Sequence, residues 1–299
     1  MSRSTVSLKG ALTPIPTPFD AEGNVAYGAL ADNLSRWNDF DLTGYVVLGS
    51  NGEAVYLDDE EKVRVWETAR RAIPSGKLMI AGTGAESTRQ TIALSRRAAQ
   101  AGADAVLVVT PNYYAGLMTS DALVAHYYAV ADASPVPVLI YNVPKFTGVD
   151  ITPAAVARAA QHPNIVGMKE TGGNVAKIAD TIRLVGPDFQ LLAGSASFLL
   201  ASLALGATGG ILALAIIAPQ EALEIYRLFH AGQLQEAAEL QRLMIPVNAA
   251  ITARFGIAGS KAALDMLGFY GGPVRPPLLD LGAAERKELR DILEAGGVL

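Results

Sequence analysis

The sequence predicts an α/β protein, a closed (β/α)₈ barrel of the TIM type that is followed by a C-terminal helical extension. Two observations carry this prediction. Eight short apolar runs recur at intervals of about 20 to 34 residues, and the intervals carry helix signals. After the eighth run the alternation stops and only helical patterns remain. A doubly wound sheet is the competing fold, but it usually has fewer strands and often a glycine-rich dinucleotide loop.

The eight apolar runs have the length and composition of strands that are buried on both faces. In chain order they are residues 11–19, 44–49, 78–84, 105–111, 136–142, 165–170, 189–195 and 209–214. The last two lie within residues 189–220, a stretch without charged side chains that imitates a membrane span. Because Gly194 and the glycines at 206–210 divide this stretch into short pieces, we expect buried core and no contact with a membrane.

Capping residues between the runs predict where helices begin and end. A side-chain oxygen at the N-cap accepts a hydrogen bond from a free amide of the first turn. The expected N-caps are Asp58 with Glu61 as its capping-box partner, Ser87, Thr119 or Ser120, and Thr152 followed by Pro153. The expected helix ends are marked by Gly102, Gly186 and Gly206.

Four helical patterns follow the eighth run, near residues 220–231, 234–252, 259–267 and 283–295. We interpret the first as the eighth barrel helix and the other three as the extension. The predicted division is therefore a barrel that carries the active site, residues 1–232, and a helical extension packed on it, residues 233–299. No linker in the sequence is long enough to divide two independent domains.

The composition excludes several classes of function. The chain has 299 residues, a formal net charge of −5 and 51% hydrophobic residues, so we expect a large core and no nucleic-acid partner. It contains no cysteine, which removes disulfides, thiolate metal sites and a cysteine nucleophile. Residues 1–10 are too few and too polar for a signal peptide, so a cytoplasmic location is expected.

Two polar residues end neighbouring apolar runs, where a barrel of this type carries its active site. Lys169 follows Ile165–Met168, and loss of solvation there favours the neutral amine that can attack a ketone and form a Schiff base. The alternative is a lysine that extends to the rim and pairs with Glu170. Tyr141 ends the preceding run, where its hydroxyl can transfer a proton. The alternative there is a ring that only packs over the barrel end.

The loop Gly-Ser-Asn-Gly-Glu at residues 49–53 follows the second run. Its two glycines allow a tight turn whose backbone amides can bind a carboxylate or a phosphate. Ser50 adds a hydroxyl group. Glu53 would repel an anion, so we interpret this carboxylate as structural.

The three histidines give no sign of a metal centre. His126, His162 and His230 lie in predicted helices or just after one, away from the strand ends and without metal-ligand spacing. A metal-dependent aldolase is therefore disfavoured, and no metal or organic cofactor is expected.

Three motifs occur together at the ends of the second, fifth and sixth runs: GSNGE at 49–53, YNVP at 141–144 and GMKE at 167–170. In this order and spacing they resemble the dihydrodipicolinate synthase/N-acetylneuraminate lyase superfamily, and the likeness covers essentially the whole chain. The resemblance implies a (β/α)₈ barrel with a helical extension. It also implies a Schiff base between a lysine and pyruvate, or the pyruvyl part of a substrate, and a homo-oligomer, a dimer or a tetramer.

The resemblance also assigns catalytic roles. Lys169 corresponds to the Schiff-base lysine and Tyr141 to the catalytic tyrosine, while Ser50 stands at the hydroxyl position of the proton relay. Tyr113 corresponds to a tyrosine that reaches into the site of the neighbouring subunit. By this resemblance an active unit contains at least two copies of the chain.

Further residues correspond to substrate-binding positions of the family. Asn51 follows Ser50 in the loop that binds the pyruvate carboxylate, and Thr171 and Gly194 correspond to residues near the substrate. Phe146 is a departure from the synthases, which carry an arginine there for the carboxylate of the second substrate. Whether Lys145, the preceding residue, replaces that arginine is left open by the sequence.

Other stretches of the chain are more similar to the 4-hydroxy-2-oxoglutarate aldolases of this superfamily. They are TPNYY at 110–114, QHPNIVGMKE at 161–170, LAGSASF at 192–198, NAAITARFGIAG at 248–259 and GFYGGPVRPPL at 268–278. The implied activity is the cleavage of 4-hydroxy-2-oxoglutarate to pyruvate and glyoxylate. The alternatives are a 4-hydroxy-tetrahydrodipicolinate synthase, a 2-keto-3-deoxy sugar-acid lyase, and a barrel that binds 2-keto acids without catalysis.

Overall fold

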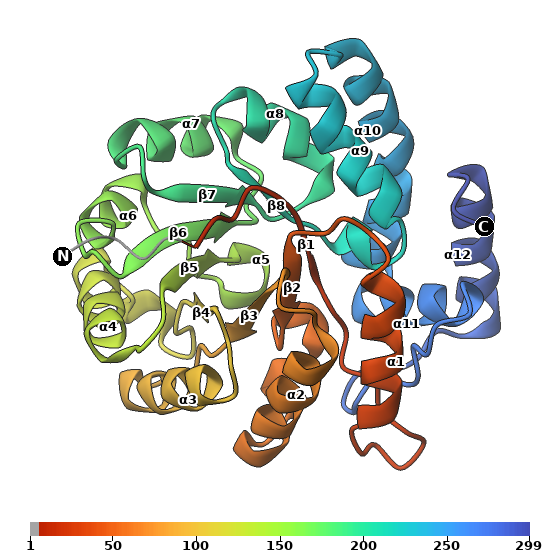
Figure 1. Cartoon of the computed structure of the whole chain (residues 1–299), viewed down its shortest axis with the longest axis horizontal. Coiled ribbons are helices and arrows are strands. Elements are labelled where there is room, and N and C mark those ends of the chain that lie inside the picture. The colour runs from red at the N-terminus through yellow and green to blue at the C-terminus, as the bar shows by residue number, and fades with distance from the viewer. Residues whose placement is uncertain (1–5) are drawn as a thin grey trace.

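Eight parallel strands close into a barrel within residues 6–299, the part of the chain that the computed structural model describes. Each strand pairs with the next one along the chain, and β8 pairs with β1. The strands are β1 (Gly10–Pro14), β2 (Gly44–Val47), β3 (Leu78–Gly82), β4 (Ala105–Val109), β5 (Val138–Asn142), β6 (Ile165–Glu170), β7 (Gln190–Ala193) and β8 (Gly209–Ile211). The predicted (β/α)₈ barrel is confirmed (Figure 1). Residues 1–5, on which part of the signal-peptide expectation rests, lie outside the described residues.

Several strands are shorter than the apolar runs that predict them. β1 stops at Pro14, because Pro16 and Pro18 lack the amide hydrogen that a strand ladder needs. β8 stops at Ile211, and Ala213–Ile216 of the following apolar segment form a 3₁₀ turn, η5. These apolar runs therefore include both a strand and the first part of the loop that follows it.

Helices connect the strands and form an outer layer around the barrel (Figure 1). The connecting helices are α1 (Tyr27–Trp37), α2 (Asp59–Ala72), α3 (Thr88–Gln100), α4 (Ser120–Ala133), α5 (Pro144–Thr147), α6 (Pro153–Ala159), α7 (Val175–Leu184), α8 (Leu199–Ala204) and, after β8, α9 (Pro219–His230). Short 3₁₀ turns in the connecting loops are η1 (Ser50–Gly52), η2 (Ala54–Tyr56), η3 (Ala115–Leu117) and η4 (Ala196–Phe198).

The predicted N-caps are confirmed. Asp58 and Glu61 form a complete capping box at the start of α2, with each side chain accepting a hydrogen bond from the other residue's amide. Ser87, Thr119 and Thr152 each accept a hydrogen bond from an amide in the first turn of their helix. These signals are local in the sequence, which is why they could be interpreted without the fold.

The glycine signals at the helix ends are confirmed in part. Gly102 after α3 and Gly206 after α8 have φ angles of +91° and +102°, the conformation that favours glycine. Gly186 does not cap its helix, because α7 ends at Leu184 and Val185 leaves the helix in an extended conformation.

Replacement of Asp58 by alanine is expected to lower the free energy of unfolding by about 1 kcal/mol, because an amide at the start of α2 loses its acceptor. Urea denaturation followed by circular dichroism measures this loss. The control is Glu67→Ala on an exposed face of the same helix, which is expected to change stability by less than about 0.5 kcal/mol. Equal stability of the two variants would contradict the capping role.

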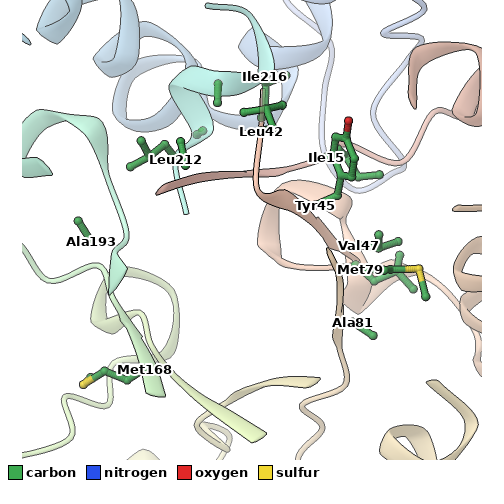
Figure 2. Close-up of a cluster of buried hydrophobic side chains, with 14 of the residues drawn as sticks. Ile15, Leu42, Tyr45, Val47, Met79, Ala81, Met168, Ala193, Leu212 and Ile216 are labelled. Atoms are coloured by element: carbon green, nitrogen blue, oxygen red, sulfur yellow. The ribbon is translucent and has the colours of Figure 1, made fainter. Parts of the chain in front are cut away.

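The apolar side chains of the strands form two layers, because successive residues of a strand point to opposite faces of the sheet. One layer fills the barrel interior and includes Leu12, Ile80, Leu107, Leu139 and Ile211. The other lies between strands and helices, and Figure 2 shows part of it, including Tyr45, Val47, Met79, Ala81 and Met168. Since Met168 faces the helices, its neighbour Lys169 faces the barrel interior.

The uncharged stretch 189–220 is divided among β7, η4, α8, β8, η5 and the start of α9. Its large apolar side chains are mostly buried in the core, as predicted, with Leu192, Leu199 and Ile211 fully inaccessible to solvent. Within residues 6–299, no helix combines the length and the apolar character needed to cross a bilayer.

Three further helices follow α9 on one side of the barrel (Figure 1). They are α10 (Leu234–Ala249), α11 (Gly256–Met266) and α12 (Ala283–Ala295), with one π-helical turn, η6 (Ala250–Arg254), between α10 and α11. Trp37 of α1 contacts both the barrel and the extension. Its indole N–H donates to the Ile216 carbonyl after β8 at 3.0 Å, and its ring stacks on Phe269 after α11. The helices of the extension are confirmed, whereas the division at residue 232 stays a prediction.

Candidate active site

Three of the predicted catalytic side chains meet at the carboxyl end of the barrel. Tyr141 and Lys169 are paired residues at the ends of β5 and β6, and Lys169 Nζ lies 4.5 Å from the centre of the Tyr141 ring. The Tyr141 hydroxyl lies 3.2 Å from Ser50 Oγ, in the loop after β2. Parallel strands in register therefore place an amine, a phenol and an alcohol in one small region.

Lys169 is buried, with 3% of its surface exposed, and its amine has no acidic partner among residues 6–299. The alternative in which Lys169 extends to the rim and pairs with Glu170 is wrong. The two side chains point to opposite faces of the sheet, and Glu170 pairs instead with Lys177 of α7 at 3.2 Å. The Lys169 amine is therefore held inside the barrel with no carboxylate of the described residues beside it.

Glu170 belongs to a polar network on the outer face of the sheet. Asn142 Nδ2 donates to Glu170 Oε2 at 2.9 Å and to Asp150 Oδ1 at 2.8 Å. The Gly172 amide donates to Glu170 Oε1 at 2.6 Å, and Lys177 contacts both carboxylates. This network ties the end of β5 to the end of β6, the two strands that carry Tyr141 and Lys169.

Tyr141 combines the two interpretations offered by the sequence. Its ring packs in the apolar interior of the barrel, among the residues that include Leu139 and Val143. Its hydroxyl nevertheless reaches Ser50, so the ring is fixed by packing and the polar atom faces the candidate site. A phenol held in this way can exchange a proton with a bound molecule.

The loop after β2 presents unpartnered backbone donors. Ser50–Gly52 form the 3₁₀ turn η1, in which the amides of Gly52 and Glu53 donate to the carbonyls of Gly49 and Ser50. The amides of Ser50 and Asn51 have no acceptor within the described residues. Two free amides beside a buried lysine form a suitable place for a carboxylate.

Glu53 is structural, as predicted, since its carboxylate is fully buried and paired with a cation. Its Oε1 lies 2.5 Å from Lys261 Nζ of α11, and its Oε2 accepts a hydrogen bond from the Arg275 amide at 2.9 Å. Thr17, at the end of the first apolar run, donates to the Gly52 carbonyl at 2.6 Å. The loop is therefore held from β1 on one side and from the C-terminal extension on the other.

Thr171 and Gly194 lie in contact just beyond β6 and β7. Thr171 Oγ1 donates to the Asn142 carbonyl at 2.6 Å, and the Gly194 amide donates to the Glu170 carbonyl at 2.7 Å. A Cβ atom on residue 194 would lie 2.1 Å from Thr171 Cγ2, so only glycine fits this close approach. Their substrate-binding roles stay predictions.

Tyr113 and Phe146 are not brought into the Ser50–Tyr141–Lys169 group within one chain. Tyr113 is 79% exposed and Phe146 is 60% exposed, and each lies in a loop or short helix at the barrel mouth. Lys145 donates to the Thr252 carbonyl of η6 at 3.2 Å. Its amine is thus directed toward the C-terminal extension.

The histidines lie in helices or just after one, as predicted: His126 is in α4, His230 ends α9 and His162 follows α6. Burial lowers the pKa of His126 to about 4, and its Nδ1 contacts the Thr88 hydroxyl at 2.9 Å. His162 contacts Asp132 on the surface, and His230 packs against the Tyr226 ring. In the part of the chain that the structure describes, no group of three or more His, Asp or Glu side chains is arranged to hold a metal ion.

The roles of Lys177, Lys261 and Arg275, which hold the strand ends and the loop, are missed by sequence analysis. The only available signal was indirect: a carboxylate that must be buried, such as Glu53, requires a cation somewhere in the chain. Which of the 24 lysines and arginines supplies it depends on tertiary contacts.

Comparison with known proteins decides the family. The model of the dihydrodipicolinate synthetase family matches residues 7–296. The chain belongs to the dihydrodipicolinate synthetase family. The resemblance inferred from the three motifs is therefore confirmed, and family membership makes the chain an enzyme of the aldolase and lyase class.

Curated relatives within the dihydrodipicolinate synthetase family carry two names. A protein of Emericella nidulans named probable mitochondrial 4-hydroxy-2-oxoglutarate aldolase is 40% identical over 255 residues, covering 84% of this chain and 82% of the relative. A 4-hydroxy-tetrahydrodipicolinate synthase of Thermodesulfovibrio yellowstonii is 35% identical over 292 residues, covering 97% of this chain and 99% of the relative.

Solved structures of the dihydrodipicolinate synthetase family share the fold over nearly the full length. The chloride-inhibited dihydrodipicolinate synthase of Acinetobacter baumannii, complexed with pyruvate, superposes with a TM-score of 0.93 at 32% identity. The match covers 98% of this chain and 100% of that one. The enzyme of Aquifex aeolicus matches with a TM-score of 0.92 at 30% identity, covering 97% and 99% of the two chains.

Proposed function

We propose that this enzyme is a class I pyruvate-type aldolase that cleaves 4-hydroxy-2-oxoglutarate to pyruvate and glyoxylate. One observation carries the proposal: the buried Lys169 amine has no carboxylate partner and lies beside Tyr141, whose hydroxyl contacts Ser50. An amine kept free of acidic groups and a phenol within reach of the same bound atom are the two groups that Schiff-base formation needs.

The first step is formation of the covalent intermediate. The lone pair of neutral Lys169 attacks the C2 carbonyl carbon and gives a carbinolamine. Tyr141 donates its proton to the carbinolamine hydroxyl, which leaves as water, and a protonated imine with a tyrosine phenolate remains. Ser50 stabilises that phenolate by donating a hydrogen bond across the 3.2 Å contact.

The second step breaks the C3–C4 bond. The Tyr141 phenolate takes the proton of the C4 hydroxyl, C4 becomes the aldehyde of glyoxylate, and the bond electrons move through C3 to the imine nitrogen. The resulting enamine takes a proton at C3 from Tyr141. Water then adds to the imine carbon and releases pyruvate and the free lysine. The protonated imine is the electron sink, so the proposal includes no metal and no organic cofactor.

The loop after β2 binds the pyruvyl carboxylate in this proposal. The free amides of Ser50 and Asn51 donate to its oxygens, and the turn dipoles add positive potential there. In this proposal Thr171 and Gly194 form the pocket wall beside the imine, where glycine at 194 allows the chain after β7 to approach Thr171 closely.

The substrate assignment rests on Phe146 and on the relatives. An exposed aromatic ring at this position cannot form the bidentate pair with a carboxylate that an arginine forms. Lys145 donates to the Thr252 carbonyl, which turns it toward the extension and away from the role of that arginine. A relative that is 40% identical is named a probable 4-hydroxy-2-oxoglutarate aldolase, and Phe146 is proposed to contact the aldehyde part of the substrate.

A second copy of the chain is part of the same proposal. Tyr113, Tyr114 and Leu117 form an exposed apolar group at the barrel mouth, and the two tyrosine rings stack edge to face. We propose a homo-oligomer, a dimer or tetramer, in which Tyr113 joins the relay of the neighbouring site. A cytoplasmic location stays a prediction.

The experiment that tests the function is release of pyruvate from 4-hydroxy-2-oxoglutarate, measured with purified enzyme in the presence of EDTA. Efficient release is expected, because the proposed electrophile is an imine and not a metal. The same preparation is expected to be at least about tenfold slower with pyruvate and aspartate semialdehyde, since the arginine clamp is absent.

Phe146→Arg is the matched variant for substrate choice. It is expected to slow the aldolase reaction and to raise the synthase reaction, because a guanidinium then stands at the mouth. Loss of pyruvate release in EDTA that zinc restores would overturn the metal-free proposal. Faster turnover of aspartate semialdehyde by the unmodified enzyme would overturn the substrate assignment.

A further inference from the structure

We propose that Glu53 is a positioning residue for the candidate site, and that Lys261 and Arg275 of the C-terminal region hold it in place. The proposed effect is on the Ser50–Asn51 amides, which the proposed function assigns to the substrate carboxylate. The inference rests on that function and adds a dependence of substrate binding on the C-terminal extension.

The backbone of the loop is bounded by two residues in an uncommon conformation. Leu48 and Glu53 have φ angles of +63° and +53°, in the left-handed region that side chains other than glycine rarely adopt. At Leu48 the chain lies against β3 so closely that a Cβ on Gly82 would come within 2.0 Å of the Leu48 carbonyl oxygen. At Glu53 the amide closes the turn by donating to the Ser50 carbonyl at 3.2 Å. Such conformations persist only where the surroundings enforce them.

The surroundings at Glu53 are two cationic residues from the C-terminal part of the chain. The Glu53 and Lys261 side chains are 0% and 1% exposed and lie 2.5 Å apart. The other carboxylate oxygen accepts from the Arg275 amide at 2.9 Å. Each oxygen of Glu53 thus has its own contact, and the carboxyl plane is fixed relative to the turn.

Lys261 and Arg275 are themselves anchored, so they can act as a rigid support. Lys261 Nζ donates to the Pro273 carbonyl at 2.7 Å, and burial lowers the pKa of Lys261 while the Glu53 carboxylate opposes that shift. Both cations lie over the Phe19 ring, at 4.3 Å and 4.5 Å from its centre.

The Arg275 side chain also binds residues next to the Ser50–Glu53 turn. Its guanidinium donates to the Tyr56 carbonyl of η2 at 2.8 Å and to both carboxylate oxygens of Glu61 at 2.6 and 2.7 Å. The guanidinium also donates to the Gly23 carbonyl at 2.7 Å. η2 directly follows Glu53, so the turn is held at its carboxylate and just after it.

A buried ion pair adds little net stability compared with apolar packing of the same volume, but it fixes direction and distance. Here it fixes a residue whose amide closes the turn that begins at Ser50. Displacement of that turn by about 1 Å would misalign the Ser50 and Asn51 amides with a bound carboxylate, which can change rates by about a hundredfold. The pair is therefore suited to preorganise the binding loop.

The test is borohydride trapping of pyruvate on Glu53→Gln, followed by mass spectrometry at a series of pyruvate concentrations. The pyruvate concentration for half-maximal labelling is expected to rise about tenfold or more. Deuterium uptake by residues 48–57 is expected to increase in the same variant, and this second readout does not depend on catalysis. Glu53→Gln with unchanged half-saturation and unchanged uptake would overturn the inference.

The double variant Glu53→Gln/Lys261→Met separates positioning from stability. It removes the unpaired charge that Glu53→Gln leaves on Lys261, so its melting temperature is expected to recover toward that of the unmodified enzyme. Its half-saturation is expected to stay raised, because the turn is still unsupported. Recovery of both quantities would show that only stability was affected and would reject positioning.

Asp104→Asn is the matched control at the opposite end of the barrel, where Asp104 pairs with Arg70 and accepts from the Met79 amide. In this variant the pyruvate concentration for half-maximal labelling is expected to be unchanged. A rise equal to that of Glu53→Gln would show that the Glu53 effect reflects lower overall stability and not positioning of the loop. Should Glu53→Gln fail to fold, Arg275→Met carries the test with an expected rise of a few fold. If the unmodified enzyme traps no pyruvate, the proposed function fails, while the deuterium-uptake comparison still decides the inference.

Discussion

Lys169→Ala is expected to abolish covalent trapping of pyruvate by borohydride and to lower kcat for pyruvate release by about 10³-fold or more. Alanine has no amine that could attack the carbonyl carbon, so the nucleophile is removed. Mass spectrometry of the trapped protein measures the adduct and its position. Labelling that persists on another lysine of the variant would contradict the assignment.

Lys77→Met is the matched control for Lys169→Ala. Burial lowers the pKa of Lys77, but Lys77 precedes β3 at the opposite end of the barrel and donates to the Asn38 carbonyl at 2.9 Å. Trapping is expected to be unchanged in this variant. Comparison of Lys169→Ala with Lys77→Met therefore shows whether pyruvate trapping requires a lysine at the carboxyl end of a strand or any buried lysine.

Tyr141→Phe is expected to lower kcat by about 10² to 10⁴-fold, the range of a positioned proton donor, while the half-saturation for pyruvate changes little. The ring that packs in the barrel interior is retained, and only the hydroxyl next to Ser50 is lost. Steady-state kinetics together with the trapping assay separate these two quantities.

Tyr45→Phe is the control for Tyr141→Phe. Tyr45 is buried between the strands and the helices, and its hydroxyl donates to Asn38 Oδ1 at 2.8 Å, so its loss is expected to cost about 1 kcal/mol of stability with full activity. An unchanged kcat in Tyr141→Phe would remove Tyr141 as proton carrier. An equal loss of activity in both tyrosine variants would indicate weakened folding as the common cause.

The features that the sequence predicted correctly are local or follow from the order of the strands. The Asp58–Glu61 capping box spans four residues and needs no knowledge of the fold. The contact between Tyr141 and Lys169 is long-range, but parallel strands that follow one another in a barrel are neighbours, so two strand ends must meet. Polar residues at those ends could therefore be grouped in advance.

The features that could not be predicted depend on contacts between distant parts of the chain. Glu53 could be interpreted as structural, but its partner Lys261 lies in the C-terminal extension and shares no motif with it. The rejected pairing of Lys169 with Glu170 fails for a geometric reason, because adjacent strand residues face opposite sides. Tyr113 and Phe146 are exposed in one chain, and their roles depend on molecules that a single sequence does not contain.

The contact between Arg275 and Glu53 has a consequence for the order of events on the ribosome. The two residues are 222 positions apart, so Glu53 is synthesised long before either cation that surrounds it. A buried carboxylate without a partner is strongly unfavourable. In a nascent barrel Glu53 is therefore expected to stay hydrated after all eight strands have emerged, and to become buried only once Lys261 and Arg275 have been synthesised.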